Sequence, residues 1–160
     1  METSTIILDG REVSEKIREN IKREVEYYLQ RGCREPSLAV ILVGDDPPSL
    51  VYVGNKRKAC EKVGIRSIFY HLPYNTKLEE LLELIAELNA REDVDGILVQ
   101  LPLPPHIPMQ DVILAISPRK DVDGFHPENM GRLLGRLEGG FIPCTPLGID
   151  LLLKHYQIDL

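Results

Sequence analysis

Two hydrophobic periods alternate along this chain, and this alternation limits the possible folds more than any other feature. Continuous aliphatic runs such as SLAVILVG (37–44) are typical of strands buried on both faces of a parallel sheet. Between such runs, apolar residues recur every three or four positions, as they do on amphipathic helices. Strand and helix in alternation favour right-handed crossovers. We therefore predict an α/β fold: a three-layer parallel sheet flanked by helices.

Start and stop residues divide the chain into these elements. The first predicted helix carries apolar residues from Val13 onward, and Gly32 closes it as a left-handed C-terminal cap. We predict that Ser49 caps a second helix ending before Gly64, and that Thr76 caps a leucine-rich third helix. The other predicted elements are strands over 65–73 and 95–104, short helices over 109–116 and after the polar segment 118–133, and a helix over 147–156.

Length and charge narrow the class of protein. The 160 residues, 43% hydrophobic and 28% charged, are typical of one soluble globular domain. A net charge of −6 disfavours nucleic acid and anionic membrane surfaces as partners. No apolar run approaches the roughly 18 residues of a membrane-spanning helix, and the acidic start METSTIILDG does not fit a signal peptide. We expect a cytoplasmic protein.

Potential metal ligands are sparse. Cys33, Cys60 and Cys144 form no C-x-x-C pair, so we predict reduced and mostly buried thiols, and the histidines show no ligand spacing. Asp121 and Asp123 in K-D-V-D-G could form a turn, bind a ligand through a carboxylate, or hold a divalent cation with substrate phosphates. Neither G-x-x-x-x-G-K-[ST] nor G-x-G-x-x-G occurs, so we expect no metal and no phosphate-binding loop.

Lys56 is the clearest candidate for a reactive side chain. Steps of 100° place it on one arc of its predicted helix with Tyr52 and Val63, while most charged residues fall on the opposite arc. An inward lysine loses hydration, which lowers the pKa of its amine toward the range of a general base. Tyr52, one turn earlier, could contact the amine or stack on a flat ligand. The alternative is a lysine that extends past the edge of the core to water.

Gln100 ends the predicted strand GILVQ and opens the loop LPLPP. It should therefore lie at the carboxyl edge of the sheet, where open α/β folds bind ligands. Its amide offers both a donor and an acceptor for orienting a substrate. The alternative role is to cap the proline-rich loop, in which the bond before Pro102 could be cis.

Four segments in this order resemble the methylenetetrahydrofolate dehydrogenase/cyclohydrolase family. They are YVGNKRKACEKVGI, DGILVQLPLP, KDVDGFHPENMGRL and FIPCTP. The resemblance covers nearly the whole chain and implies that 1–160 is the family's catalytic, folate-binding domain. It implies that Lys56 is the central catalytic residue, that Tyr52 contacts the pterin, and that Gln100 tunes the protonation of the lysine.

The resemblance also implies binding residues and a reaction. Asp123 would anchor the pterin, whose amino group and ring N–H suit a carboxylate, and Leu101 and Pro102 would line the cleft. In this family, 5,10-methylenetetrahydrofolate gives a hydride to NADP, and the methenyl product is hydrolysed to 10-formyltetrahydrofolate. The resemblance thus implies one-carbon metabolism that serves purine biosynthesis, with tetrahydrofolate derivatives as partners.

Family members continue into a Rossmann domain, and no such segment follows FIPCTP and its helix here. We therefore expect a chain truncated relative to the family, with no cofactor-binding residues of its own. The resemblance implies a homodimer for the parent enzyme and leaves the oligomeric state of this chain open. Two alternatives stay open as well: a stand-alone cyclohydrolase, and a non-catalytic folate-binding or interaction module.

Overall fold

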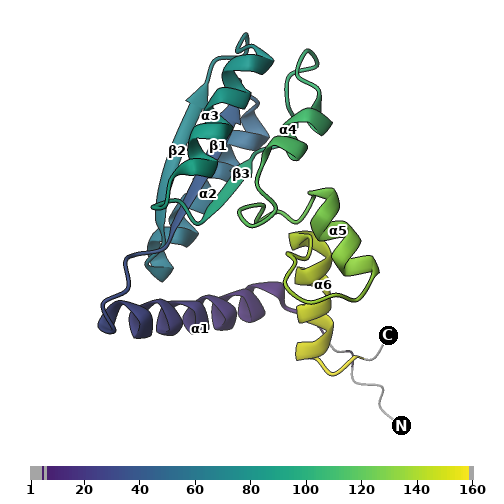
Figure 1. Cartoon of the computed structure of the whole chain (residues 1–160). Coiled ribbons are helices and arrows are strands. Elements are labelled where there is room, and N and C mark those ends of the chain that lie inside the picture. Colours follow the sequence, from purple (N-terminus) through teal and green to yellow (C-terminus); the bar gives the residue numbers. More distant parts are fainter. Residues whose placement is uncertain (1–4, 6, 159–160) are drawn as a thin grey trace.

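One parallel sheet forms the centre of the computed structural model, which describes residues 5 and 7–158 (Figure 1). Its strands are β1 (Ser37–Val43), β2 (Arg66–Leu72) and β3 (Gly96–Val99). They run in the order β2–β1–β3. The whole of β1 pairs with β2, and its residues from Leu38 to Ile41 also pair with β3. The predicted parallel α/β sheet is confirmed.

Helices cover both faces of the sheet. They are α1 (Gly10–Gln30), α2 (Pro47–Val63), α3 (Leu78–Ala90), α4 (Met109–Ala115), α5 (Pro127–Leu134) and α6 (Cys144–His155). Successive side chains of a strand point to opposite faces. Ala39, Ile41 and Val43 accordingly pack with α3 and α4, whereas Val40 and Leu42 pack with α2. The three predicted layers are therefore α2, the sheet, and α3 with α4.

The two ends of the described chain meet outside these layers. Figure 1 shows α1 crossing below the sheet, with α6 beside its N-terminal end and α5 above α6. The main-chain N–H of Asp9, just before α1, donates to the hydroxyl of Tyr156, just after α6, at 3.0 Å. No helix in the described part of the chain is long and apolar enough to cross a membrane.

Both glycine stops are confirmed, but the two predicted N-caps, Ser49 and Thr76, are wrong. Gly32 and Gly64 both have positive φ at the ends of α1 and α2. The cap of α2 is Asp46 rather than Ser49: its carboxylate accepts the main-chain N–H of Ser49 at 3.0 Å and the hydroxyl at 2.6 Å. The prolines at 47 and 48 begin the helix, as their fixed φ and missing N–H allow.

The start of α3 also differs from the prediction. Its N-cap is Lys77, whose N–H donates to the side chain of Glu80 at 3.1 Å. Thr76 instead donates its hydroxyl to the carbonyl of Pro73 at 2.7 Å, within the preceding turn. A threonine beside a helix start can hydrogen-bond either within the preceding turn or to the first turn of the helix, and Thr76 bonds within the turn.

Other predictions need smaller corrections. The strand predicted over 95–104 ends at Val99, α5 begins inside the polar segment 118–133, and α6 starts before residue 147. The cysteines are not mostly buried: Cys33 and Cys144 are exposed and Cys60 is half-buried. Cys33 follows the turn that ends α1, and Cys144 opens α6, where the residue is exposed although its thiol meets the carbonyl of Val122.

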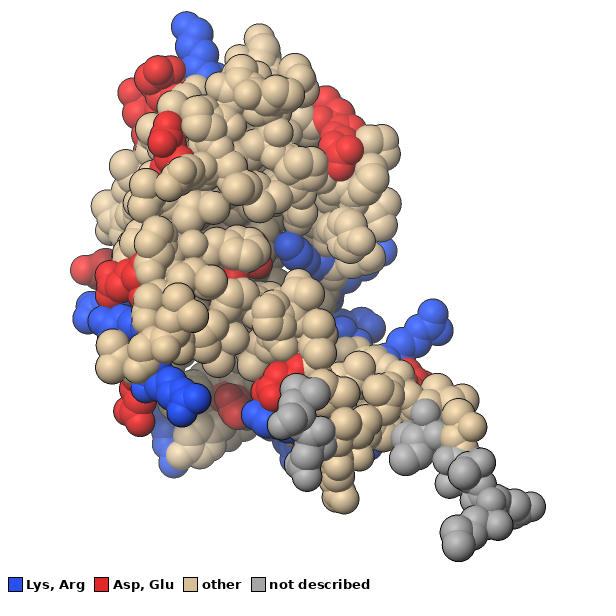
Figure 2. Space-filling model, turned by 90° about the vertical axis from the view of Figure 1, so that its right-hand side faces the viewer, with Lys and Arg blue, Asp and Glu red and all other residues tan. Residues whose placement is uncertain are grey.

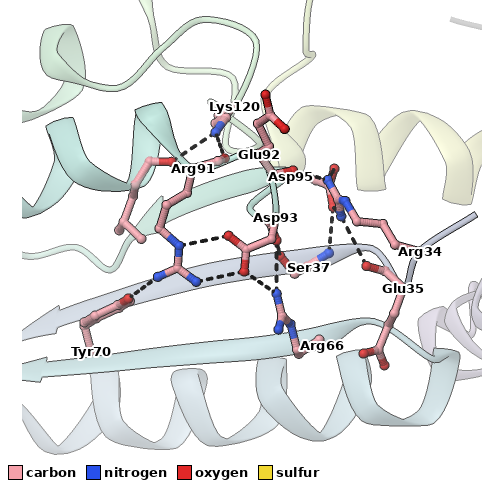
Figure 3. Close-up of polar contacts among 11 residues, drawn as sticks. Arg34, Glu35, Ser37, Arg66, Tyr70, Arg91, Glu92, Asp93, Asp95 and Lys120 are labelled. Atoms are coloured by element: carbon pink, nitrogen blue, oxygen red, sulfur yellow. Dashed lines mark hydrogen bonds and ion pairs between the residues drawn. The ribbon is translucent and has the colours of Figure 1, made fainter.

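Ion pairs hold together the edge of the sheet where the strands begin (Figure 3). Asp93 pairs with Arg66 at 2.7 Å and with Arg91 at 2.9 Å. Arg34 pairs with Asp95 at 2.7 Å, and Asp95 also accepts the main-chain N–H of Ser37 at 2.8 Å. These contacts join the residues before β1 and β3 to the start of β2.

The cap of α2 yields a stability prediction. Asp46→Ala should lower the free energy of unfolding by about 1 kcal/mol, because the N–H of Ser49 loses its acceptor. Ser49→Ala should cost less, because the main-chain bond to Asp46 remains. Urea denaturation measures both, with Asp46→Asn as the control that keeps an acceptor. A larger loss for Ser49→Ala would restore Ser49 as the dominant capping residue.

The edge network yields a pH prediction. The Arg34 guanidinium holds the pKa of Asp95 below its ordinary value. The ionised carboxylate therefore stabilises the fold at neutral pH, and this contribution fades as pH falls below about 4. In urea denaturation, Asp95→Asn should be less stable than the wild type at pH 7, with the gap narrowing toward pH 3. Asp150→Asn, at an exposed helical ion pair, is the control. A gap unaffected by pH would contradict the assignment.

Candidate functional site

The carboxyl ends of β1 and β3 bring two predicted site residues into direct contact. Lys56 lies on α2, the helix that follows β1, and Gln100 directly follows β3. The ammonium Nζ of Lys56 donates to Oε1 of Gln100 at 2.9 Å. Both side chains are half-buried. The structure thus brings these two predicted site residues together at the sheet edge, and their catalytic roles stay predictions.

Gln100 is held at three points. Its main-chain N–H donates to the carbonyl of Ile41 at 2.8 Å, which continues the pairing with β1. Its side-chain Nε2 donates to the carbonyl of Leu101 at 2.7 Å, so Oε1 faces the lysine. The same amide therefore caps the proline-rich loop and holds the lysine amine, and its role toward a substrate stays a prediction.

Three further predicted residues differ in exposure. Tyr52 lies one turn before Lys56 on α2 and leaves 61% of its surface exposed, so its ring is open to a ligand. Leu101 is half-buried and Pro102 is exposed, in the loop after β3. The peptide bond between them is cis. Their lining role stays a prediction.

Asp123 is a half-buried carboxylate in a tight turn. The N–H of Gly124 donates to the carbonyl of Asp121 at 3.2 Å, which closes the turn over 121–124. Burial raises the pKa of Asp123, and the nearby positive charge of Lys56 partly opposes this shift. Lys56 and Asp123 therefore share one electrostatic environment, which links the third predicted segment to the first.

Asp121 has a different environment from Asp123. It is only 3% exposed, and its Oδ2 accepts the main-chain N–H of His126 at 2.8 Å and Nδ2 of Asn129 at 2.9 Å. It is thus a turn-forming residue that holds the start of α5. Among the described residues, no group of three or more His, Cys, Asp or Glu could hold a metal ion. Of the readings considered for D-x-D, the turn-forming one describes Asp121.

The segment FIPCTP lies against the Asp123 turn. A Cβ added to Gly124 would come within 2.7 Å of the nitrogen of Pro143, so the two backbones approach as only glycine permits. The thiol of Cys144 donates to the carbonyl of Val122 at 3.3 Å. Burial and the adjacent Asp123 raise the pKa of this thiol. The third and fourth segments therefore form one wall of the site.

Asn129 is a site-forming residue that sequence reasoning missed. Its side chain is buried and donates to the carbonyl of Pro118 at 3.0 Å as well as to Asp121. Its Oδ1 accepts the N–H of Phe141 at 3.3 Å, which ties the Asp123 turn to FIPCTP. The hydrophobic pattern of the sequence does not single out Asn129, because α5 is short and Asn129 is a polar residue on its buried side.

Apolar side chains are exposed on the helices around this wall. Uncharged residues cover most of the side of the molecule drawn in Figure 2. The exposed apolar residues that α5, α6 and their connection contribute include Leu133, Leu134, Leu137, Phe141, Ile142 and Ile149.

Comparison with known proteins places the chain in a family. Residues 8–123 match the model of the tetrahydrofolate dehydrogenase/cyclohydrolase catalytic domain. A protein named bifunctional protein FolD, from Aquifex aeolicus, is 68% identical over 155 residues, covering 97% of this chain and 53% of its own length. A FolD of Legionella pneumophila (strain Corby) is 54% identical, and the match covers 96% of this chain and 54% of the relative. The chain spans about half the length of the curated relatives it matches.

Solved structures agree with this match. The structure of the FolD methylenetetrahydrofolate dehydrogenase/cyclohydrolase from Campylobacter jejuni superposes with a TM-score of 0.94 at 52% identity, covering 98% of this chain and 55% of that one. The structure of the Trypanosoma brucei enzyme, complexed with NADP cofactor and inhibitor, gives a TM-score of 0.92 at 36% identity. The match covers 99% of this chain and 54% of that one. The chain therefore belongs to the tetrahydrofolate dehydrogenase/cyclohydrolase family, whose catalytic domain its residues 8–123 match.

Proposed function

We propose that this chain carries the folate site and catalytic lysine of a bifunctional enzyme. That enzyme oxidises 5,10-methylenetetrahydrofolate with NADP and hydrolyses the methenyl product to 10-formyltetrahydrofolate. The observation that carries the proposal is the 2.9 Å contact between Lys56 and Gln100, with the half-buried Asp123 close enough to feel the charge of the lysine. Relatives named for both activities support it.

Lys56 is the proton-transfer group in this proposal. A neutral amine avoids repelling the methenyl cation and can accept a proton from the attacking water. Gln100 suits such a lysine because its Oε1 accepts an N–H from either the ammonium or the neutral amine. The lysine therefore keeps its orientation while its charge changes, and a carboxylate in place of the amide would favour the ammonium instead.

Substrate binding is assigned to residues around the lysine. Asp123 would accept the amino group and ring N–H of the pterin in parallel. Tyr52, with its exposed ring, would stack against the substrate, and Leu101 and Pro102 would line the cleft. The negative charge of Asp123 would also favour the cationic intermediate.

NADP is the proposed hydride acceptor, and hydride transfer is the chemistry it supplies when bound. The sequence contains neither of the glycine-rich phosphate loops that hold such cofactors. The residues of this chain therefore do not fit a complete nucleotide site, and we assign no cofactor-binding residue to them. Hydrolysis of the methenyl compound needs no nucleotide, so a stand-alone cyclohydrolase is the second candidate for the isolated chain.

The setting we propose is cytoplasmic one-carbon metabolism, in which 10-formyltetrahydrofolate serves purine biosynthesis. The net charge of −6 disfavours nucleic acid as a partner. A homodimer of the parent enzyme stays a prediction from the family resemblance.

Removal of the lysine tests the assignment. Lys56→Met should reduce the rate of 5,10-methenyltetrahydrofolate hydrolysis by roughly 10²-fold or more, the usual contribution of a general acid–base group. Lys56→Arg should be similarly impaired, because a guanidinium does not release its proton near neutral pH. The loss of methenyl absorbance measures the rate, after circular dichroism has established folding.

Lys58→Met is the matched control, because Lys58 is exposed on the same helix. It should retain the wild-type rate. Full activity in Lys56→Met would refute the catalytic role. A folded wild-type chain that binds folate without hydrolysing the methenyl compound would favour the non-catalytic binding module.

Removal of the carboxylate tests the binding wall. Asp123→Asn should weaken binding of 5-formyltetrahydrofolate about 10- to 100-fold, the range expected for hydrogen bonds to a charged group. Because burial raises the pKa of Asp123, wild-type affinity should begin to fall at a higher pH than an ordinary aspartate would give. Titration calorimetry from pH 7.5 to 4 measures both effects. Equal pH profiles for the wild type and Asp123→Asn would exclude this carboxylate.

A further inference from the structure

Lys120 begins K-D-V-D-G, and the proposed mechanism gives it no role. Its ammonium donates to three main-chain carbonyls, those of Leu88 at 3.0 Å, Asn89 at 2.8 Å and Arg91 at 2.7 Å. Figure 3 shows its side chain reaching the main chain beside Arg91. These carbonyls belong to the end of α3, where a helix leaves its last acceptors unpaired. The lysine lies about thirty residues further along the chain, so the contact joins two separate segments.

The end of α3 is a rigid point of attachment. Leu81, Ile85 and Leu88 have no exposed surface and pack this helix against the sheet. Arg91 is fixed in turn by its ion pair with Asp93 at 2.9 Å and by donation to the hydroxyl of Tyr70 at 3.0 Å. Figure 3 shows these contacts as one continuous set with the Lys120 amine. A group bonded to these carbonyls has little freedom to move.

The main chain carries this constraint from Lys120 to Asp123. The carbonyl of Lys120 accepts the N–H of Ile97 at 2.7 Å, so the residue is held by β3 as well as by α3. The turn over 121–124 follows at once and contains Asp123. Asp123 thus lies three residues from a fixed point, inside the turn that follows Lys120 directly.

We propose that Lys120 is a positioning residue that sets the place of Asp123 at the folate site through its bonds to the end of α3. The inference rests on the proposed function, in which Asp123 binds the pterin. A plain capping lysine is the alternative, and the two differ in their consequences. Capping predicts lost stability alone, whereas positioning predicts lost affinity for folate and a changed environment for Asp123.

Substitution of the lysine distinguishes these possibilities. Lys120→Met should weaken binding of 5-formyltetrahydrofolate about tenfold by titration calorimetry, and Lys120→Arg, which can donate to the same carbonyls, should restore affinity to within about threefold of wild type. Arg34→Met is the matched control: it removes an ion pair at the same edge of the sheet without touching the segment 117–124. It should lower the melting temperature and leave affinity unchanged.

A second readout needs no ligand. The side-chain carboxyl of Asp123, followed by ¹³C NMR, faces Lys56, Asp121 and the thiol of Cys144. In Lys120→Met the turn should open to water, so the pKa of Asp123 should fall toward its ordinary value. Arg34→Met should leave the titration as in the wild type.

The outcomes separate this inference from the proposed function. Unchanged affinity and unchanged Asp123 titration in folded Lys120→Met would overturn the positioning role, as would an equal loss of affinity in Arg34→Met. If the wild type does not bind 5-formyltetrahydrofolate but the Asp123 titration still moves only in Lys120→Met, the positioning role stands and the proposed function fails. Should Lys120→Met not fold, Lys120→Ala, which removes every donor, replaces it, and wild-type affinity and titration there would overturn the inference.

Discussion

Burial of β1 on both faces is the constraint on which the rest of the structure depends. Residues 39–42 have no exposed surface, so helices must cover the sheet on two sides. Parallel pairing with both neighbours then requires a helix between successive strands, and each helix starts at the carboxyl edge. For that reason α2 begins beside the loop that follows β3. The contact between Lys56 and Gln100 is a geometric consequence of this arrangement.

The alternation of hydrophobic periods was sufficient to predict the layers and most helices and strands. These features depend on which face of each helix or strand is buried, and the hydrophobic pattern shows that face directly. Helix starts were less predictable. Asp46, Ser49, Thr76 and Lys77 are polar residues within a few positions of a helix start, and which of them becomes the N-cap depends on turn geometry. The ends of α1 and α2 at Gly32 and Gly64 were predictable, because a helix end with positive φ favours glycine over other residues.

The same distinction holds at the site. Lys56 and Gln100 could be identified from local pattern, one from the arc of a helix and the other from the end of a strand. Local pattern did not distinguish Asp121 from Asp123, and only the family resemblance did. The two differ in tertiary partners: Asp121 meets Asn129 and His126, whereas Asp123 lies within the influence of the Lys56 charge. Residues whose role is set by contacts across the fold carry no periodic signal in the sequence.

The two edges of the sheet use charge in opposite ways. Where the strands begin, the carboxylates of Asp93 and Asp95 each meet a guanidinium, and this lowers the pKa of both. At the carboxyl edge, burial raises the pKa of Asp123, although Lys56 lies near. A partly desolvated carboxylate destabilises the free protein and gains most when a ligand supplies hydrogen bonds. The ion pairs at the first edge hold the ends of the strands together, while the second edge keeps the carboxylate of Asp123 available for binding. Lys120 connects the two edges. Its side chain bonds to the end of α3 at the first edge, and its main chain leads into the turn that contains Asp123.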